Sequence, residues 1–413
     1  MKMVGKMAFQ GLRVGVIGGS IAGCAAAIAL GRAGCRVEVF ERSSKGLMDR
    51  GSGIGIPVPL RTDLIERGYL PAGFPGCEMR RRWWQYPDGT QVGRRIWTQT
   101  TPAFANNWGN IWQALRNNVP DAIYHEGWML EAFEETEDAV NVSFAGGQTK
   151  SFDLLVGADG YQSVVREKMN PMARPEYAGY VLWRGNYAEA ELSDTSLITE
   201  IDKECAWLTV PFKGGHGVLY MIPNFDGGMS KGTRRVNWAV YAPCPRAQKL
   251  NGVESVAPGD VAPAAFEEFR LLLEECFPPA IRDLIAHSSH ADVSIQPIYD
   301  SLVDTYVGPR TLLIGDAGTM TRPHTASGAT KALEDATAIE DLASDTSDLA
   351  DFLKRYDAKR CGQARTLSKL GRRIGQAQVL DTPDWSKMSV DDFETWHTSM
   401  MSGDTLYLYG EEA

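Results

Sequence analysis

Two glycine-bearing turns, far apart in the sequence, carry residues whose types and spacing suit nucleotide chemistry. The first is GGSIAG, residues 18–23, which lies between an apolar run and an alanine-rich stretch. Gly18 allows a tight turn, Ser20 is small enough to let the backbone approach a phosphate, and Gly23 lets a helix pack closely on a strand. A helix that begins here directs free N–H groups and the positive end of its dipole at a pyrophosphate.

Glu41 adds a second nucleotide contact to this turn. It follows the predicted strand at residues 36–40, and an acidic side chain at that point of a βαβ unit binds ribose hydroxyls. The alternative is a glycine-rich turn of an α/β protein that binds no nucleotide. Because strand, turn, helix and acid occur together, the sequence favours a nucleotide site.

The second turn is Gly315-Asp316, which follows the predicted strand at residues 310–314. An aspartate there can accept charge-assisted hydrogen bonds from the hydroxyls of a ribityl chain. Ser327 and Gly328 begin the next predicted helix, where backbone N–H groups can face a flavin carbonyl. Ser327 can instead be a helix cap worth about 1 kcal/mol, and the two roles are compatible. Two such turns in one chain indicate a long dinucleotide, and therefore FAD rather than a nicotinamide cofactor alone.

The elements that must hold these turns form two patterns. Residues 12–17, 20–33 and 36–40 predict the strand–helix–strand unit of dinucleotide-binding folds. Later segments alternate, are rich in aromatic side chains and predict an antiparallel sheet, at residues 181–188, 206–211, 218–222 and 236–241. Helices are expected at residues 326–343, 348–359 and 364–374.

The predicted fold is α/β, with a discontinuous, Rossmann-like FAD-binding domain, an inserted antiparallel-sheet substrate domain and C-terminal helices. We expect the FAD-binding domain at residues 1–75, 105–175 and 300–345. The substrate domain is expected at residues 76–104 and 176–299, and a C-terminal helical segment at residues 346–413.

Charge and composition exclude several classes of protein. The net charge is −10 and no basic field covers the chain, so neither nucleic acid nor a membrane is expected as a partner. Seven scattered cysteines argue against a disulfide framework and for a reducing compartment, so we expect a cytoplasmic protein, a monomer or a homodimer. No His, Cys and carboxylate group has metal-ligand spacing, and no metal is expected.

Three turns taken together resemble those of a known family: GGSIAG with Glu41, Ala158-Asp159-Gly160, and Gly315-Asp316. The family is the FAD-dependent aromatic hydroxylases, single-component flavoprotein monooxygenases with the p-hydroxybenzoate hydroxylase fold. Within it, several stretches resemble the 2,6-dihydroxypyridine 3-hydroxylase branch: GYVLWRG (179–185), NWAVY (237–241), QPIYD (296–300) and RPH (322–324). The usual GQGxN of the last loop reads ASGAT here, at residues 326–330.

The resemblance implies an FAD-dependent, NAD(P)H-consuming monooxygenase. Such an enzyme uses dioxygen, takes NADH or NADPH as co-substrate, and hydroxylates a small hydroxylated aromatic or N-heteroaromatic substrate through a flavin hydroperoxide. The alternatives are a flavin monooxygenase of natural-product tailoring (epoxidation or Baeyer–Villiger insertion), a flavin-binding non-enzyme, and a plain nicotinamide dehydrogenase.

The resemblance also implies which residues contact FAD. Glu41 would bind the adenosine ribose, Asp159 would support the pyrophosphate region and Asp316 would bind the ribityl chain. The expected cofactor-binding residues are Gly18, Ser20, Ile21, Ala22, Glu41, Arg42, Ile56, Leu130, Asp159, Asp316, Pro323, Ser327, Gly328 and Ala329.

Three side chains are candidates for catalytic work on the substrate. His324 directly follows Pro323 and can hydrogen-bond a hydroxylated ring, Arg184 can pair with an oxyanion or carboxylate, and Tyr220 lies on a strand of the aromatic sheet. His216 sits between two glycines and is expected in a hairpin. Since only one face of each strand looks inward, the sequence leaves open whether the pocket or the core holds Trp183, Trp207, Trp238 and Tyr241.

Overall fold

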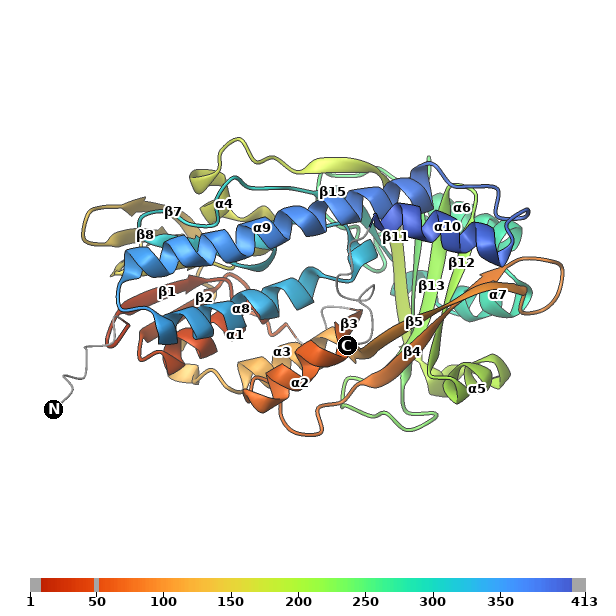
Figure 1. Ribbon diagram of the computed structural model, residues 1–413, viewed down its shortest axis with the longest axis horizontal. Helices are drawn as coiled ribbons and strands as arrows, with labels where there is room; N and C mark the ends of the chain where they lie inside the picture. Colours follow the sequence, from red (N-terminus) through yellow and green to blue (C-terminus); the bar gives the residue numbers. More distant parts are fainter. Residues whose placement is uncertain (1–8, 48–51, 403–413) are drawn as a thin grey trace.

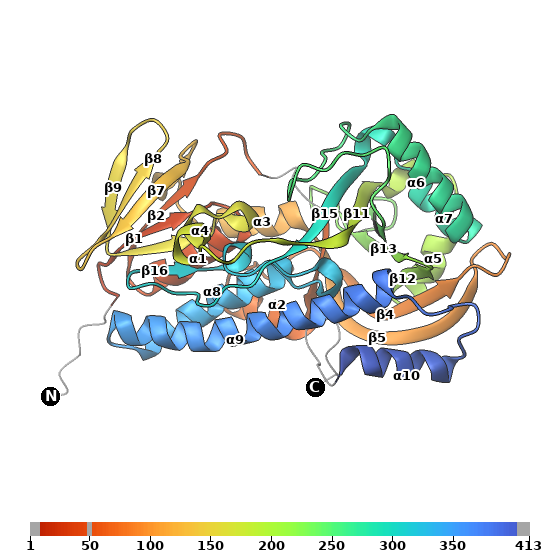
Figure 2. The ribbon, with the colours of Figure 1, turned by 90° about the horizontal axis from the view of Figure 1, so that it is seen from above.

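The computed structural model describes residues 9–47 and 52–402. Within them the strands form three sheets, and the two larger sheets lie toward opposite ends of an elongated molecule (Figure 1). The long helix α9 (Leu349–Gly375) runs from one of these sheets toward the other (Figure 2). In the described ranges, no helix has the length and apolar character needed to cross a membrane.

The first large sheet is parallel, with the strand order β16-β10-β1-β2-β6. Its strands are β1 (Arg13–Ile17), β2 (Arg36–Glu41), β6 (Tyr124–Glu126), β10 (Leu154–Gly157) and β16 (Thr311–Leu313). Strand β10 is buried at every position, as expected for a parallel strand that is covered on both faces. Helix α1 (Ile21–Arg32) joins β1 to β2 and packs on α8 (Gly328–Asp345). The predicted strand–helix–strand unit is confirmed.

The second large sheet has the strand order β15-β11-β14-β13-β12-β4-β5-β3. Its strands are β3 (Gly53–Pro57), β4 (Cys77–Tyr86), β5 (Arg94–Asn107), β11 (Glu176–Ala188), β12 (Ala206–Phe212), β13 (Gly215–Ile222), β14 (Arg235–Ala242) and β15 (Ser294–Asp300). The four predicted aromatic segments are β11 to β14. Neighbouring strands are antiparallel except β12 and β4, which are parallel. A small third sheet holds β7 (Leu130–Glu135), β8 (Val140–Phe144) and β9 (Thr149–Phe152).

One face of the eight-stranded sheet packs against α6 (Pro263–Cys276) and α7 (Pro279–Ala286). Trp183 and Trp238 belong to this core, and their ring centroids lie 4.4 and 5.5 Å from that of Phe269 on α6. Trp207 and Tyr241 instead line a cavity on the opposite face. Strand alternation therefore settles the question that the sequence left open.

The C-terminal helices differ from the prediction. Residues 349–375 form the single helix α9, so the expectation of two helices at 348–359 and 364–374 was wrong. Gly362 lies inside α9 with open space around it, so this glycine does not interrupt the helix. A π-helical turn (Gln376–Leu380) follows, and α10 (Val390–Met401) then lies beside β4 and β5 (Figure 2). The predicted domain boundaries stay predictions.

Candidate active site

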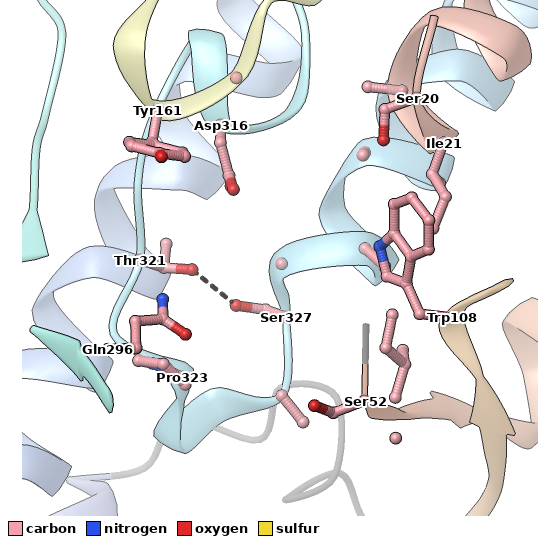
Figure 3. Close-up of a pocket in the computed structure, with 18 of the residues that line it drawn as sticks. Ser20, Ile21, Ser52, Trp108, Tyr161, Gln296, Asp316, Thr321, Pro323 and Ser327 are labelled. Atoms are coloured by element: carbon pink, nitrogen blue, oxygen red, sulfur yellow. Dashed lines mark hydrogen bonds between the residues drawn. The ribbon is translucent and has the colours of Figure 1, made fainter. Parts of the chain in front are cut away.

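A cavity of about 720 Å³ extends from the carboxyl ends of the parallel strands to one face of the eight-stranded sheet. Figure 3 looks into it, with Ser20 and Ile21 on one side and Asp316 and Thr321 on the other. Both glycine turns therefore border the same cavity, although they are far apart in the sequence.

The turn at residues 18–23 forms a narrow cradle of backbone. Gly18 has a φ of +101°, and a Cβ there would lie 2.3 Å from the carbonyl oxygen of Ala158. A Cβ on Gly23 would lie 1.8 Å from the carbonyl oxygen of Gly18, so no larger residue fits at either position. Ser20 is the N-cap of α1 and makes no side-chain cap bond. The first N–H groups of α1 are therefore available to an anion.

Glu41 braces this cradle. It ends β2 and is 7% exposed, and its carboxylate accepts hydrogen bonds from the N–H groups of Gly19 and Ser43, both at 2.8 Å. An ionised carboxylate offers about four acceptor positions, so Glu41 can still accept from a ribose hydroxyl.

Asp159 works mainly within its own turn. Its carboxylate accepts from the Ser163 hydroxyl and from the N–H groups of Val164 (2.8 Å) and Val165 (3.3 Å). These bonds cap the short helix α4 (Val164–Met169) and shape the loop that closes over Gly18. The geometry suits an indirect, supporting role beside the pyrophosphate cradle.

The second turn is wedged between two helices. Gly315 has a φ of +62°, and a Cβ there would lie 3.1 Å from Cβ of Ala22 on α1 and 3.3 Å from Cβ of Ala332 on α8. Asp316 projects into the cavity (Figure 3), and its side chain is 47% exposed. Arg166 donates a hydrogen bond to the Asp316 carbonyl oxygen at 3.0 Å, which fixes the backbone of the turn.

The start of α8 forms the far wall of this part of the cavity. Ser327 occupies the N-cap position without a side-chain cap bond. Its hydroxyl is instead bonded to those of Thr321 (3.0 Å, Figure 3) and Thr325 (2.6 Å). A Cβ on Gly328 would meet no atom within 4 Å. The helix therefore presents backbone N–H groups to the cavity over an unobstructed surface.

These features fit FAD, because one cavity offers a backbone cradle, two acids spaced along it and a helix N-terminus at its end. All but one of the expected cofactor-binding residues line the cavity. The exception is Ile56, which is fully buried in the core, whereas Ile54 and Gly55 line the cavity in its place. The contacts of the other residues with FAD stay predictions.

Small side chains form the floor on the eight-stranded sheet. Val218 of β13 pairs with Ala239 of β14, and Arg184 of β11 pairs with Ala239 from the other side. Arg184 lines the cavity and donates to Oε1 of Gln296 at 3.1 Å. Among the described side chains, no carboxylate lies within ion-pair distance of Arg184, and burial lowers the pKa of its guanidinium.

Tyr220 also lies in the cavity wall, but its hydroxyl is bonded to backbone. It donates to the Gly53 carbonyl oxygen at 3.0 Å, and the Gly53 N–H donates to Oδ1 of Asn237 at 2.8 Å. A Cβ on Gly53 would lie 2.4 Å from Cε2 of Tyr220. The side chains of Tyr220 on β13 and Asn237 on β14 therefore fix the start of β3 in place.

His324 is buried in the cavity wall, and hydrogen bonds hold both its ring and the residue two positions before it. Its Nε2 lies 2.7 Å from the Tyr180 hydroxyl. The neighbouring Arg322 donates to Asp300, a fully buried carboxylate, at 2.7 Å. Burial lowers the pKa of His324 well below its ordinary value, and the nearby His216 and Arg322 lower it further.

Among the cavity residues that sequence reasoning missed, two carry titratable side chains at the sheet end. His216 does follow a hairpin turn, but its ring is buried, stacks on Tyr241 at 4.5 Å between centroids, and lies 5.4 Å from His324. His216 lies on the same face of β13 as Val218, two residues later. A predicted strand that began at residue 216 instead of 218 would therefore have included it. Arg82 stacks between Trp84 and Trp207 and also lines the cavity, and no pattern marked it.

Two family models match separate parts of the chain. A family model for an NAD(P)-binding Rossmann-like domain matches residues 16–45, and one described as FAD binding domain-like matches residues 177–298. A 2,6-dihydroxypyridine 3-monooxygenase from Paenarthrobacter nicotinovorans is 30% identical over 379 residues, which cover 89% of this chain and 91% of that protein. An FAD-dependent urate hydroxylase from Klebsiella oxytoca is 29% identical over 387 residues, covering 87% and 88%.

A solved structure of similar fold is 2,6-dihydroxypyridine-3-hydroxylase from Arthrobacter nicotinovorans, with a TM-score of 0.79 and 25% identity over 93% of this chain and 96% of that one. The chain belongs to the FAD-dependent aromatic hydroxylase family. It is a flavoprotein monooxygenase that uses FAD together with NADH or NADPH.

Proposed function

We propose that this monooxygenase hydroxylates a small, planar aromatic or N-heteroaromatic ring that carries an ionised oxygen, and that Arg184 binds this oxygen. The observation that carries the proposal is the half-buried guanidinium of Arg184, which lines the cavity and has only the neutral Gln296 as a side-chain partner among the described residues. When a substrate fills the cavity and displaces its water, this charge becomes costly unless an opposite charge pairs with it. An anionic substrate supplies that charge.

The distribution of charge along the cavity supports this assignment. The acidic residues that line it, Glu41, Asp159 and Asp316, all belong to the end with the nucleotide turns. At the sheet end the cavity is lined by two arginines, Arg184 and Arg82, and by no acidic side chain among the described residues. The cofactor end is therefore built for sugar hydroxyls, and the sheet end for an anion.

The shape of the sheet end suits a single flat ring. Val218 and Ala239 leave space above the floor, while Trp207 and Tyr241 form aromatic walls. Aromatic side chains position a planar ring through stacked and edge contacts and exclude water from it.

We assign His324 to the ring hydroxyl of the substrate, with Tyr180 holding the imidazole. Tyr180 keeps its proton at neutral pH, because burial raises the pKa of its hydroxyl to about 12. A protonated phenol can donate to Nε2 of a neutral imidazole, and Nδ1 then carries the imidazole proton. Through the proton on Nδ1, His324 would donate a hydrogen bond to the substrate oxygen. This bond would fix the ring in place for oxygen transfer.

FAD would lie along the cavity with its adenosine near Glu41 and its flavin ring near the start of α8. We propose that the adenosine ribose binds Glu41, that the pyrophosphate lies in the cradle at residues 18–23, and that the ribityl chain binds Asp316. The flavin ring would meet the segment 323–329, and Leu130 would contact the adenine. Bound FAD supplies the redox chemistry, in which two electrons come from NADH or NADPH, one oxygen atom of dioxygen enters the ring and the other leaves as water.

The experiment measures NADH and NADPH oxidation with a panel of rings, namely 2,6-dihydroxypyridine, urate and simple phenols. We expect at least one member of this ring panel to stimulate oxidation and to gain one oxygen atom by mass. Arg184→Met should raise KM for that ring by about tenfold or more, because a buried charge pair is lost, and FAD content should stay unchanged.

Arg235→Met is the matched control. Arg235 is also bonded to a side-chain amide, that of Asn186 at 2.6 Å, but it lies outside the cavity lining. Its variant should keep the wild-type KM. A ring panel that stimulates nothing, or an Arg184→Met enzyme with the wild-type KM, would contradict the proposal.

We further propose a cytoplasmic enzyme that is a monomer or a homodimer. The seven cysteines are all free, which fits a reducing compartment. Cell fractionation and light scattering of the purified protein test the two statements; recovery in an oxidising compartment, or a larger assembly, would oppose them.

A further inference from the structure

Lys331 carries a buried positive charge beside the cofactor end of the cavity. It lies in the first turns of α8 and is 1% exposed. Its Nζ has no hydrogen-bond partner among the described residues and lies 3.9 Å from Oδ1 of Asp316. An ammonium group buried in this way is costly unless a nearby carboxylate offsets its charge.

Asp335 is a buried carboxylate near Lys331, and it is already bonded to other groups. Asp335, one turn further along α8, accepts the N–H of Gly315 at 2.8 Å and forms an ion pair with Arg360. Arg360 also donates to the carbonyl oxygen of Lys331 at 3.2 Å. Lys331 therefore shares the charge of Asp335 with Arg360, and Asp316 is the second carboxylate that acts on its ammonium.

Asp316 is the group through which this charge reaches the cavity. Its carboxylate is 47% exposed and faces the cavity, whereas Lys331 does not line the cavity itself. Once a ligand fills that space, the carboxylate loses most of its water, and the low dielectric strengthens its attraction to an ammonium 3.9 Å away.

We propose that Lys331 is a positioning residue of the cofactor site, which keeps the Asp316 carboxylate ionised and directed at the ribityl hydroxyls of FAD. The inference rests on the placement of Asp316 at the ribityl chain, given under Proposed function. Lys331 acts from outside the cavity and does not touch the cofactor.

Removal of Lys331 should make FAD binding depend on pH. Burial raises the pKa of Asp316, and the positive charges of Lys331 and Arg166 oppose this rise. Without Lys331 the carboxylate takes up a proton at a higher pH, so the affinity for FAD falls as the pH is lowered. The charged groups that face this pair are Arg166 on α4, Glu334 and Asp335 on α8, and Arg360 on α9.

The test titrates the full chain, stripped of its flavin, with FAD between about pH 8 and pH 6, and follows the quenching of FAD fluorescence. We expect Lys331→Met, which conserves the shape of the side chain, to raise the Kd about tenfold, with a larger loss at the lower pH. Lys331→Arg should keep the wild-type pH dependence. Lys354→Met, at an exposed position on α9, should change nothing.

A double-mutant cycle with Asp316→Asn separates a specific role from a structural one. In the Asp316→Asn background, Lys331→Met should change the Kd by less than about twofold. An equal loss in both backgrounds, or a Lys331→Met chain with wild-type affinity, would overturn the proposal. If Lys331→Met does not fold, as judged by circular dichroism, Lys331→Gln takes its place in the cycle. Unchanged affinity in Asp316→Asn would overturn the placement of Asp316 instead.

Discussion

The Tyr180 hydroxyl oxygen lies 2.7 Å from Nε2 of His324, and both side chains are buried. The segment that carries His324 is anchored through Arg322 to Asp300, which also accepts a hydrogen bond from Arg372 of α9 at 2.8 Å. Gly375 ends α9 next to the pair, where a Cβ would lie 2.3 Å from the Tyr180 hydroxyl. Three separate segments of chain therefore fix the orientation of this imidazole.

Tyr180→Phe should lower kcat/KM for the active ring by about ten- to a hundredfold, because the buried imidazole loses the partner that sets its tautomer. The Kd for FAD should stay unchanged, and the dependence of kcat/KM on pH should shift. Tyr177→Phe, on the same strand but 42% exposed, is the control. Wild-type kcat/KM and pH dependence in Tyr180→Phe would remove Tyr180 from the mechanism.

His324→Ala should impair hydroxylation more than FAD binding. If the imidazole holds the substrate hydroxyl, its loss lets the ring move, and electrons from NADH or NADPH then reach dioxygen without oxygen transfer. The measurement is the ratio of hydroxylated product to oxidised nicotinamide, together with released hydrogen peroxide. A ratio and a turnover equal to those of the wild type would exclude the assigned role.

Gly375→Ala should reproduce the effect of Tyr180→Phe although neither side chain of the pair is replaced. The added methyl group would lie 2.3 Å from the Tyr180 hydroxyl, 3.0 Å from Nη1 of Arg322 and 3.2 Å from Nε2 of His324, so these groups must move apart. Gly362→Ala is the matched control in the same helix. It meets open space and should stabilise the protein by up to about 1 kcal/mol through helix propensity. Equal activity in the two variants would contradict the described packing.

His216 should make the protein less stable in acid. Burial lowers the pKa of His216 to about 3, whereas the unfolded chain has a value near 6.5. The neutral form is favoured in the fold, so this contribution is complete above about pH 6.5 and is lost as the pH falls toward 3, by at most about 1.4 kcal/mol per pH unit.

Urea denaturation at a series of pH values tests this statement. His216→Phe can keep the stack on Tyr241 but carries no titrating group, so its free energy of unfolding should fall less steeply with decreasing pH than that of the wild type. Parallel curves for the two proteins would show that His216 is not buried in its neutral form.

The cofactor end of the site could be predicted from sequence because its signals are local. A strand, a glycine turn, a helix and Glu41 follow one another directly, and Gly315-Asp316 again follows a strand. Each motif depends on backbone geometry within a few residues, which glycine and the helix start fix by themselves.

The substrate end could be predicted only in part, because its residues meet through the register of distant strands. The sequences of β11 and β14 do not show which face of the sheet α6 covers, and therefore do not show that Trp183 and Trp238 lie in the core. Tyr180 and His324 are far apart in the sequence, so their hydrogen bond could not be predicted without the fold. His216 was assigned to a hairpin because glycines flank it, although it is a residue of strand β13. The long strand β4 was missed because its charged Arg80 and Arg81 hid the alternation of a half-exposed strand.

The most direct test of the whole account is a reaction under isotopically labelled dioxygen, with the purified flavoprotein, NADH or NADPH, and the member of the ring panel that stimulates oxidation. The account predicts a product that contains one labelled oxygen atom per turnover and an Arg184→Met enzyme that needs far more of the ring to form it. A product whose new oxygen comes from water, or nicotinamide oxidation that no ring in the panel stimulates, would contradict it.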